Sequence, residues 1–149
     1  MPIRVAAIGM IHWHSLYDAA YLHHLAAMDD VEIVGIHDSN PEIALHRATE
    51  IGGRIATFVD YRRMISEVKP DFVLALGRHD TMAETAHFLL DNRIPFIIEK
   101  PMSYNARQLK KVLEKVEATK GFLAVPLIMR DHPFVQTARK FVEESSYGP

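Results

Sequence analysis

The 149-residue sequence contains no cysteine, which excludes a disulfide framework and a thiolate zinc site. It also lacks an excess of either charge, with 17 Lys and Arg against 19 Asp and Glu mixed along the chain. The sequence has no stripe of basic residues that could contact the phosphates of a nucleic acid, so we expect no nucleic-acid partner. No segment approaches the roughly 20 apolar residues of a membrane span, and the N-terminus has no signal-peptide pattern. We therefore expect a cytoplasmic location and no membrane partner.

Glycine is scarce where a dinucleotide-binding turn needs it. The apolar run over residues 3–8 stops at Gly9, and a helical pattern covers residues 12–28, which predicts a strand, a tight turn and a helix. Exposed N–H groups at such a turn attract phosphate, so Gly9, Met10, Ile11 and His12 are candidate cofactor-binding residues. The full dinucleotide fingerprint has glycine at two further places, where this chain has Ile11 and His14. An ordinary turn without a ligand is the alternative for this stretch alone.

Apolar strand patterns alternate with helical patterns along most of the chain. The strands are predicted over residues 3–8, 31–36, 55–58, 72–76, 94–98 and 122–125. Continuous apolar strands joined by helices call for a parallel sheet covered on both faces. We therefore predict an α/β fold, a doubly wound Rossmann sheet of about six strands in the order 3-2-1-4-5-6, with helices on both faces. Residues 1–126 would form this domain, and residues 127–149 a terminal segment with a helix over 133–144.

Several helix ends have recognisable signals. Asn40, Asp60 and Asn105 stand where N-caps are expected, and Thr81 with Glu84 forms a capping-box pattern. The helices that follow the second and fifth strands should bury one apolar face each. These faces contain Ala44, Leu45, Ala48 and Ile51 in one helix, and Leu109, Val112, Leu113 and Val116 in the other.

The predicted strand order places the ends of the first and fourth strands side by side. Ligands bind beyond the carboxyl ends at such a switch point, so Gly9 and Gly77 should border one crevice. Asp38 ends the second strand, where an acid accepts hydrogen bonds from an adenosine ribose; capping of the next helix is the alternative. Ser39 and Arg78 are further candidate cofactor contacts. A carboxylate beside the ribose repels a 2′-phosphate, so we expect NAD in preference to NADP.

Glu99-Lys100-Pro101 follows the fifth apolar strand, which places a charged pair at the crevice rim. With this motif, the chain resembles the N-terminal domain of the glucose-fructose oxidoreductase / inositol dehydrogenase / MocA (Gfo/Idh/MocA) family. The other matching stretches are Arg4-Val5-Ala6-Ala7-Ile8-Gly9, Asp38 with Pro41, Asp60-Tyr61, Ala83-Glu84-Thr85-Ala86 and Arg130-Asp131-His132-Pro133. Without the resemblance, a solvated Glu-Lys pair would be the preferred interpretation.

The resemblance implies roles for particular residues. Lys100 would be the catalytic residue that reaches the substrate or nicotinamide, Glu99 would help to place the cofactor, and Arg130 would be a further cofactor contact. The Lys100–Pro101 bond would be cis. The chain departs from the family pattern at the glycine-poor turn, at Gly77-Arg78 in place of Thr-Pro, and at Met82 in place of histidine.

The resemblance also implies a function. The chain would be the NAD-binding domain of an oxidoreductase that acts on a sugar, polyol or similar small alcohol, and it would assemble as a homo-oligomer. In the family, a second domain would follow Tyr147-Gly148 and supply the catalytic histidine and aspartate, so we expect the chain to be catalytically incomplete alone. Two alternatives are a sugar-modifying enzyme domain that uses NAD without net redox change, and a cofactor-sensing module without turnover.

Nine histidines are present, but their spacing predicts no metal site. His12 and His14 form one pair and His23 and His24 another, and adjacent helical residues point about 100° apart. No third ligand stands at a fixed spacing from either pair. Trp13 in the turn is expected to pack on the helix, with a position over the cofactor as the alternative.

Overall fold

The computed structural model describes residues 1–17, 20–52 and 54–144. One parallel sheet contains β1 (Ile3–Ile8), β2 (Val31–His37), β3 (Ala56–Phe58), β4 (Phe72–Ala75), β5 (Phe96–Ile98) and β6 (Leu123–Ala124). The strand order is β3-β2-β1-β4-β5-β6, which confirms the predicted doubly wound topology. β1 and β4 are therefore neighbours at the switch point.

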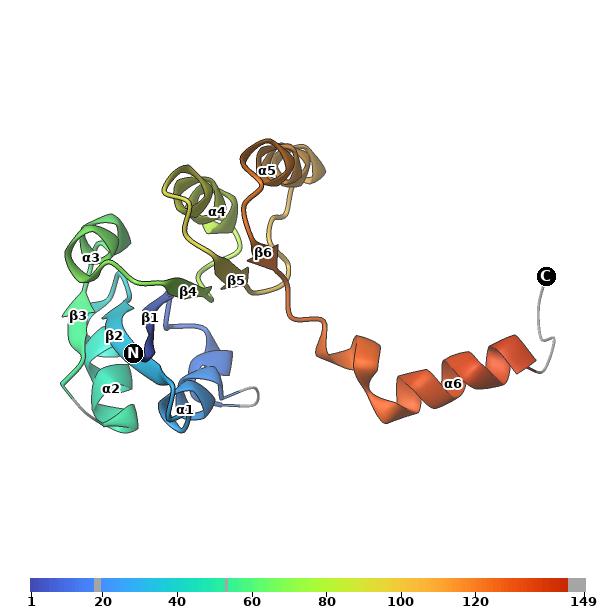
Figure 1. The fold of residues 1–149 in the computed structure, drawn as a ribbon, viewed down its shortest axis with the longest axis horizontal. Coiled ribbons are helices and arrows are strands. Elements are labelled where there is room, and N and C mark those ends of the chain that lie inside the picture. Colours follow the sequence, from blue (N-terminus) through green and yellow to red (C-terminus); the bar gives the residue numbers. More distant parts are fainter. Residues whose placement is uncertain (18–19, 53, 145–149) are drawn as a thin grey trace.

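Helices cover both faces of the sheet. α1 (Tyr21–Ala26) and α2 (Pro41–Ile51) lie on one face, while α3 (Tyr61–Val68), α4 (Met82–Asp91) and α5 (Ala106–Thr119) lie on the other (Figure 1). Successive strand residues point to opposite faces, so Ala6 and Ile8 of β1 join the core under α3 to α5, while Ala7 joins the core under α1 and α2. Burial on both faces explains why these strands are continuously apolar.

Three of the predicted helix starts have the expected caps. Asn40, Asp60 and Asn105 each accept hydrogen bonds from backbone amides in the first turn of α2, α3 and α5. The predicted capping box at Thr81 is wrong, although α4 begins there. Thr81 Oγ1 donates to the Arg78 carbonyl at 3.0 Å, and the Glu84 carboxylate pairs with Arg62. Thr81 thus bonds within the β4–α4 loop and Glu84 pairs with α3, so neither side chain forms the capping box.

The buried helix faces are narrower than predicted. Ala44 and Ala48 of α2 and Val112 of α5 are buried. Leu45 and Leu113, one residue further round each helix, are 60% and 47% exposed, so their predicted burial is wrong. One step along a helix rotates a side chain by about 100°, which carries both leucines off the sheet.

The single helix predicted over residues 12–28 is also wrong. The structure has a 3-10 turn, η1 (Trp13–Ser15), and then the short α1, preceded by Ala20 with a left-handed φ of 46°. Residues 18–19 lie outside the described residues. Seven residues of continuous helix span about 10.5 Å, which would separate His14 from Tyr21. Here both side chains contact the same oxygen of Glu99, an arrangement that the broken helix permits.

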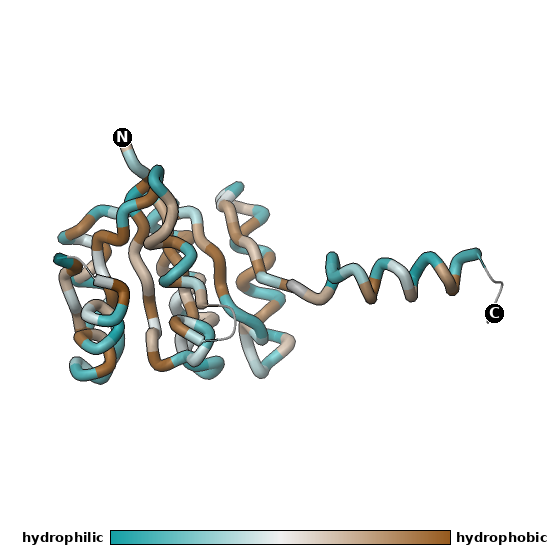
Figure 2. The backbone as a smooth tube through the Cα atoms, turned by 90° about the horizontal axis from the view of Figure 1, so that it is seen from below, coloured by the Kyte–Doolittle hydropathy of each residue, from teal (hydrophilic) through white to brown (hydrophobic). Residues whose placement is uncertain are grey.

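The last two elements are η2 (Ile128–Asp131) and α6 (Pro133–Glu144). α6 has no buried residue among those described, and it extends away from the sheet and its helices (Figures 1 and 2). The boundary at residue 126 stays a prediction, and the end of the terminal segment, residues 145–149, lies outside the described residues. Within the described part of the chain, no helix combines the length and apolar character needed to span a bilayer.

Candidate functional site

Two adjoining pockets lie beyond the carboxyl ends of β1, β2 and β4. Their volumes are about 520 Å³ and 250 Å³, and they share Ile11, Gly77 and Arg78. The larger pocket extends to His37, Asp38, Ser39, Tyr61 and Arg62, and the smaller one to His12, His79, Asp80 and Tyr104. We call the two pockets together the trench. It occupies the switch point, where doubly wound folds bind ligands.

Gly9 and Gly77 meet at the floor of the trench. A Cβ atom on Gly9 would lie 2.2 Å from the Gly77 Cα atom, and Gly9 has a φ of +76°. Both observations exclude a side chain at position 9. The glycine that ends β1 thus allows the turns after β1 and β4 to touch, as well as letting the chain reverse direction.

Unpartnered buried polar atoms are concentrated in the trench. Among the described residues, His37 Nδ1, the Tyr61 hydroxyl and His79 Nε2 lack a partner at good hydrogen-bond geometry, although the Tyr61 hydroxyl interacts with Thr85 and the His37 ring with the Val59 backbone. All three residues line one of the two pockets. Because buried polar groups nearly always have a hydrogen-bond partner, in protein or ordered water, these atoms have capacity left for a polar ligand in the trench. Burial lowers the pKa of His37 below 6.5, so this imidazole is neutral at neutral pH.

Asp38 ties the first turn to the end of β2. Its carboxylate accepts from the Ile11 amide at 2.6 Å and from the Asn40 amide at 3.0 Å. The helix cap itself is Asn40, which accepts from the Glu42 amide, so Asp38 does not cap α2 as the alternative interpretation required. Each carboxylate oxygen has more than one acceptor position, and Asp38 lines the larger pocket beside Ser39.

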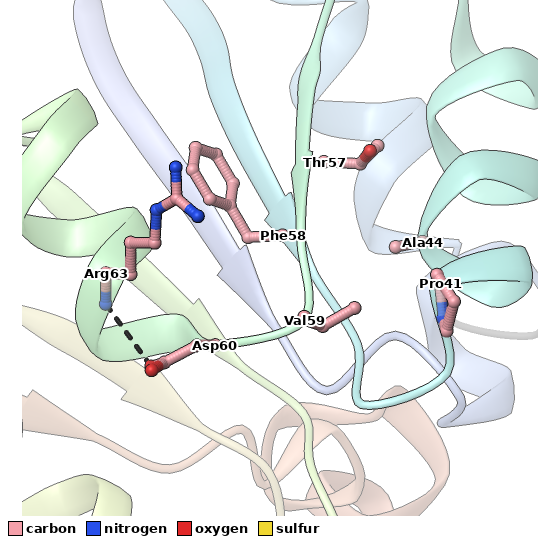
Figure 3. Close-up of a pocket in the computed structure, with 7 residues that line it drawn as sticks. All are labelled: Pro41, Ala44, Thr57, Phe58, Val59, Asp60 and Arg63. Carbon is pink, nitrogen blue, oxygen red and sulfur yellow. Dashed lines mark hydrogen bonds between the residues drawn. The ribbon is translucent and has the colours of Figure 1, made fainter.

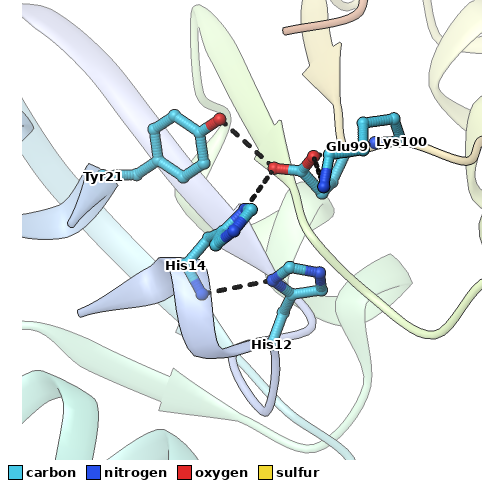
Figure 4. Close-up of polar contacts among 5 residues, drawn as sticks. All are labelled: His12, His14, Tyr21, Glu99 and Lys100. Atoms are coloured by element: carbon cyan, nitrogen blue, oxygen red, sulfur yellow. Dashed lines mark hydrogen bonds and ion pairs between the residues drawn. The ribbon is translucent and has the colours of Figure 1, made fainter. Parts of the chain in front are cut away.

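Glu99 is the centre of a buried polar cluster (Figure 4). It is fully buried rather than at the crevice rim, where the sequence placed it. Its carboxylate is 3.0 Å from His14 Nδ1, accepts from the Tyr21 hydroxyl at 3.2 Å, and accepts from the Lys100 amide at 3.0 Å. Lys100 is half-exposed, with its ammonium 3.8 Å from Glu99. The Lys100–Pro101 bond is cis, as expected from the resemblance.

Two pKa values near this cluster are displaced. Burial raises the pKa of the Glu99 carboxyl, but hydrogen bonds from His14 and the Lys100 amide, together with their charges, outweigh it and hold the pKa below 4.5. Glu99 is therefore ionised at neutral pH. Burial and the neighbouring His14, His79 and Lys100 lower the pKa of His12 below 6.5, against the opposing effect of Glu99.

Not all predicted site residues come together. Gly9, Ile11, His12, Asp38, Ser39, Gly77 and Arg78 line the trench, whereas Glu99 and Lys100 line neither of its pockets. The Met10 side chain is instead buried in the core under α1 and α2, and Arg130 lies on the exposed η2. Trp13 lies in η1 and is 59% exposed, with its ring centroid 4.9 Å from that of His14, so its packing on the helix stays a prediction. Four further residues that line the trench were not predicted as site residues from the sequence: His37, Tyr61, His79 and Tyr104. For His37, its position at the end of β2 is a signal that could have identified it, whereas His79 lies in the loop after β4.

A third hollow, of about 390 Å³, lies between the start of α2 and the β3–α3 turn (Figure 3). It shares Val59 and Asp60 with the larger pocket of the trench. Asp60 is engaged there as the cap of α3. In the described part of the chain, no three His, Asp or Glu side chains are grouped so that they could hold a metal ion.

Comparison with known proteins agrees with this geometry. Residues 3–126 match a family model described as an oxidoreductase family with an NAD-binding Rossmann fold. No curated protein matches significantly. The myo-inositol dehydrogenase from Lactobacillus casei, in complex with NAD(H) and myo-inositol, has a TM-score of 0.83 and 16% identity, with 96% of this chain and 42% of that one covered.

Two further solved structures have the same fold. A Gfo/Idh/MocA family oxidoreductase from Vibrio cholerae has a TM-score of 0.78 and 27% identity, covering 95% of this chain and 43% of that one. An oxidoreductase from Agrobacterium radiobacter, in complex with NAD+, L-tartaric acid and magnesium, has a TM-score of 0.82 and 17% identity, covering 100% and 42%. The chain thus spans less than half the length of the structures it matches. Because the family model covers most of its residues, the chain belongs to the Gfo/Idh/MocA oxidoreductases and has their NAD-binding Rossmann fold.

Proposed function

We propose that this chain is the cofactor domain of an oxidoreductase that acts on a sugar, polyol or similar small alcohol, with NAD bound along the trench. The observation that carries the proposal is that, among the described residues, the three whose side chains hold a buried polar atom without a well-placed partner all line this trench. NAD, when bound, accepts a hydride from an alcohol carbon. The chain's own residues bind the cofactor and position the alcohol.

The larger and the smaller pocket of the trench would each take one half of the cofactor. We place the adenosine half in the larger pocket, where Asp38 accepts from the ribose hydroxyls. The nicotinamide half would pass from the pyrophosphate through the smaller pocket toward Lys100. The half-exposed Lys100 ammonium can donate to a substrate hydroxyl, because its contact with Glu99 is long, at 3.8 Å. Lys100 is the catalytic residue of this proposal, and Glu99 is a positioning residue that acts through it.

Ligand-dependent thermal unfolding tests this function. NAD+ should raise the stability of the chain, by about 2.7 kcal/mol at a concentration 100 times its dissociation constant. With NAD+ saturating, myo-inositol and related polyols should raise it further. The Lys100→Ala variant should keep the response to NAD+ and lose the response to the polyol. An unchanged melting temperature with NAD+ would contradict the proposal.

A cofactor-sensing domain without turnover is the second candidate. It is favoured by the first turn, whose amides are bonded within the chain, as at Ile11. Such a domain should bind NAD+ but show the same polyol response in the parent chain and in Lys100→Ala. Because the solved relatives are more than twice as long, we expect no steady NADH production by the chain alone. Production of NADH from a sugar or polyol panel would exclude the sensing function.

A further inference from the structure

The amides of Met10, Ile11, His12 and His14 in the first turn donate inside the chain. The bonds run from Met10 N to the His37 carbonyl, from Ile11 N to the Asp38 carboxylate, from His12 N to the Gly9 carbonyl, and from His14 N to His12 Nδ1. A phosphate-binding turn needs such N–H groups to point at the ligand. The following η1 has only three residues, so its dipole contributes little. A dinucleotide bound here needs other donors for its phosphates.

Arg78 supplies the first of these donors. It lines both pockets of the trench, and therefore lies at the middle of the site, where the pyrophosphate of a dinucleotide joins its two halves. Asp80 accepts from Arg78 Nε at 3.2 Å and from Nη2 at 3.3 Å. A guanidinium has five N–H donors, so Arg78 keeps donors for a second anion.

Two imidazoles supply further donors in the smaller pocket. His12 Nδ1 accepts from the His14 amide at 3.2 Å, which leaves the ring proton on Nε2. His79 Nδ1 contacts the Tyr104 hydroxyl at 3.2 Å, and its Nε2 is one of the unpartnered buried atoms of the described residues. The two ring centroids are 6.3 Å apart. The acid in this pocket, Asp80, is already neutralised by Arg78.

We propose that the side chains of Arg78, His12 and His79 hold the pyrophosphate of the dinucleotide, in place of an amide cradle at the first turn. The proposal rests on the proposed function, since it assumes that the trench takes NAD. Hydrogen bonds from a guanidinium to a phosphate are charge-assisted and strong. Ile11 stands where the fingerprint has a glycine, and the His12 side chain beside it thus belongs to a different way of binding the same group.

Calorimetric titration of the full chain with NAD+, ADP and adenosine tests this inference. Arg78→Gln and His79→Asn should each weaken binding of NAD+ and ADP, about tenfold for Arg78→Gln, and leave adenosine binding unchanged. Arg62→Gln is the matched control, because Arg62 also lines the trench but pairs with Glu84 at its other end. The control should leave the ratio of ADP to adenosine affinity unchanged. Binding of ADP by the parent chain should weaken as salt is added.

The two hypotheses fail in different ways. If the parent chain binds NAD+ but Arg78→Gln and His79→Asn bind NAD+ and ADP as tightly as it does, side-chain recognition of the pyrophosphate is refuted and the proposed function stands. If the parent chain binds neither NAD+ nor adenosine, the proposed function fails and this inference fails with it. As a second measurement, nitrogen NMR of the Arg78 Nε group should show a shift on addition of ADP and none on addition of adenosine. Circular dichroism of each variant reports that it is folded.

Discussion

At the residue scale, Asp38 is expected to set the choice between NAD and NADP. Its carboxylate lies in the larger pocket, and two nearby groups do not offset its charge: burial keeps His37 neutral by lowering its pKa, and Arg78 lies where the two pockets meet, at the place assigned to the pyrophosphate. At an effective dielectric of about 20, two like charges ~4 Å apart repel by about 4 kcal/mol before screening. A 2′-phosphate should therefore cost at least about tenfold in affinity.

Asp38→Asn should narrow this preference while keeping an oxygen acceptor at the same place. Calorimetry with both cofactors measures the ratio of affinities. Asp91→Asn is the control, because it removes the same charge from an exposed residue of α4 that pairs with Lys115. Equal binding of NADP+ and NAD+ by the parent chain would mean that Asp38 serves only to hold the Ile11 and Asn40 amides.

The neutral histidines of the trench also make stability depend on pH. Burial lowers the folded-state pKa of His37 and of His12 below 6.5, so below that pH the unfolded chain binds protons that the folded chain does not. The free energy of unfolding should fall as pH drops from 7.5 through 6.5, and it should stop falling below the folded pKa values. Urea unfolding at several pH values measures the slope. His37→Gln should reduce the slope, and the exposed His46→Gln should not; identical slopes in all three proteins would contradict the prediction.

At the scale of single elements, two helices end on lysines in an unfavourable conformation. Lys69 follows α3 and Lys120 follows α5, with φ values of 45° and 54°. Glycine adopts this region without the steric cost that other residues have there. Lys69→Gly should therefore raise the free energy of unfolding by about 0.5–1 kcal/mol, and the melting temperature by a few degrees.

A matched substitution inside a helix should act in the opposite direction. Lys111 lies in the interior of α5 and is exposed, so Lys111→Gly should lower the free energy of unfolding by about 1 kcal/mol. Thermal and urea unfolding of the two variants give the comparison. If Lys69→Gly destabilises the chain as much as Lys111→Gly, the left-handed cap carries no strain that glycine relieves.

At the scale of the whole molecule, the sheet and its five covering helices form one body, and α6 stands apart from it (Figure 1). Since no described residue of α6 is buried, removal of residues 127–149 should change the free energy of unfolding by less than about 1 kcal/mol, the scale of substitutions that disturb no core contact. The shortened chain should also keep its melting-temperature increase with NAD+. Failure of the shortened chain to fold would show that the predicted boundary at residue 126 is misplaced.

The sequence by itself determined the sheet. Apolar runs of strand length, separated by helical periodicity and by caps such as Asn40 and Asp60, are local patterns, and right-handed crossovers leave few ways to connect them. These patterns were enough to predict the strand order, the adjacency of Gly9 and Gly77, and the position of Asp38 in the crevice.

Only the tertiary structure decided the contents of the site. Glu99 meets His14 and Tyr21 across 85 and 78 positions of sequence, and Asp38 captures the Ile11 amide across 27. Hydrogen bonds between residues so far apart have no periodicity in the sequence. They accompany the break in the predicted first helix, and one of them occupies the Ile11 amide of the turn.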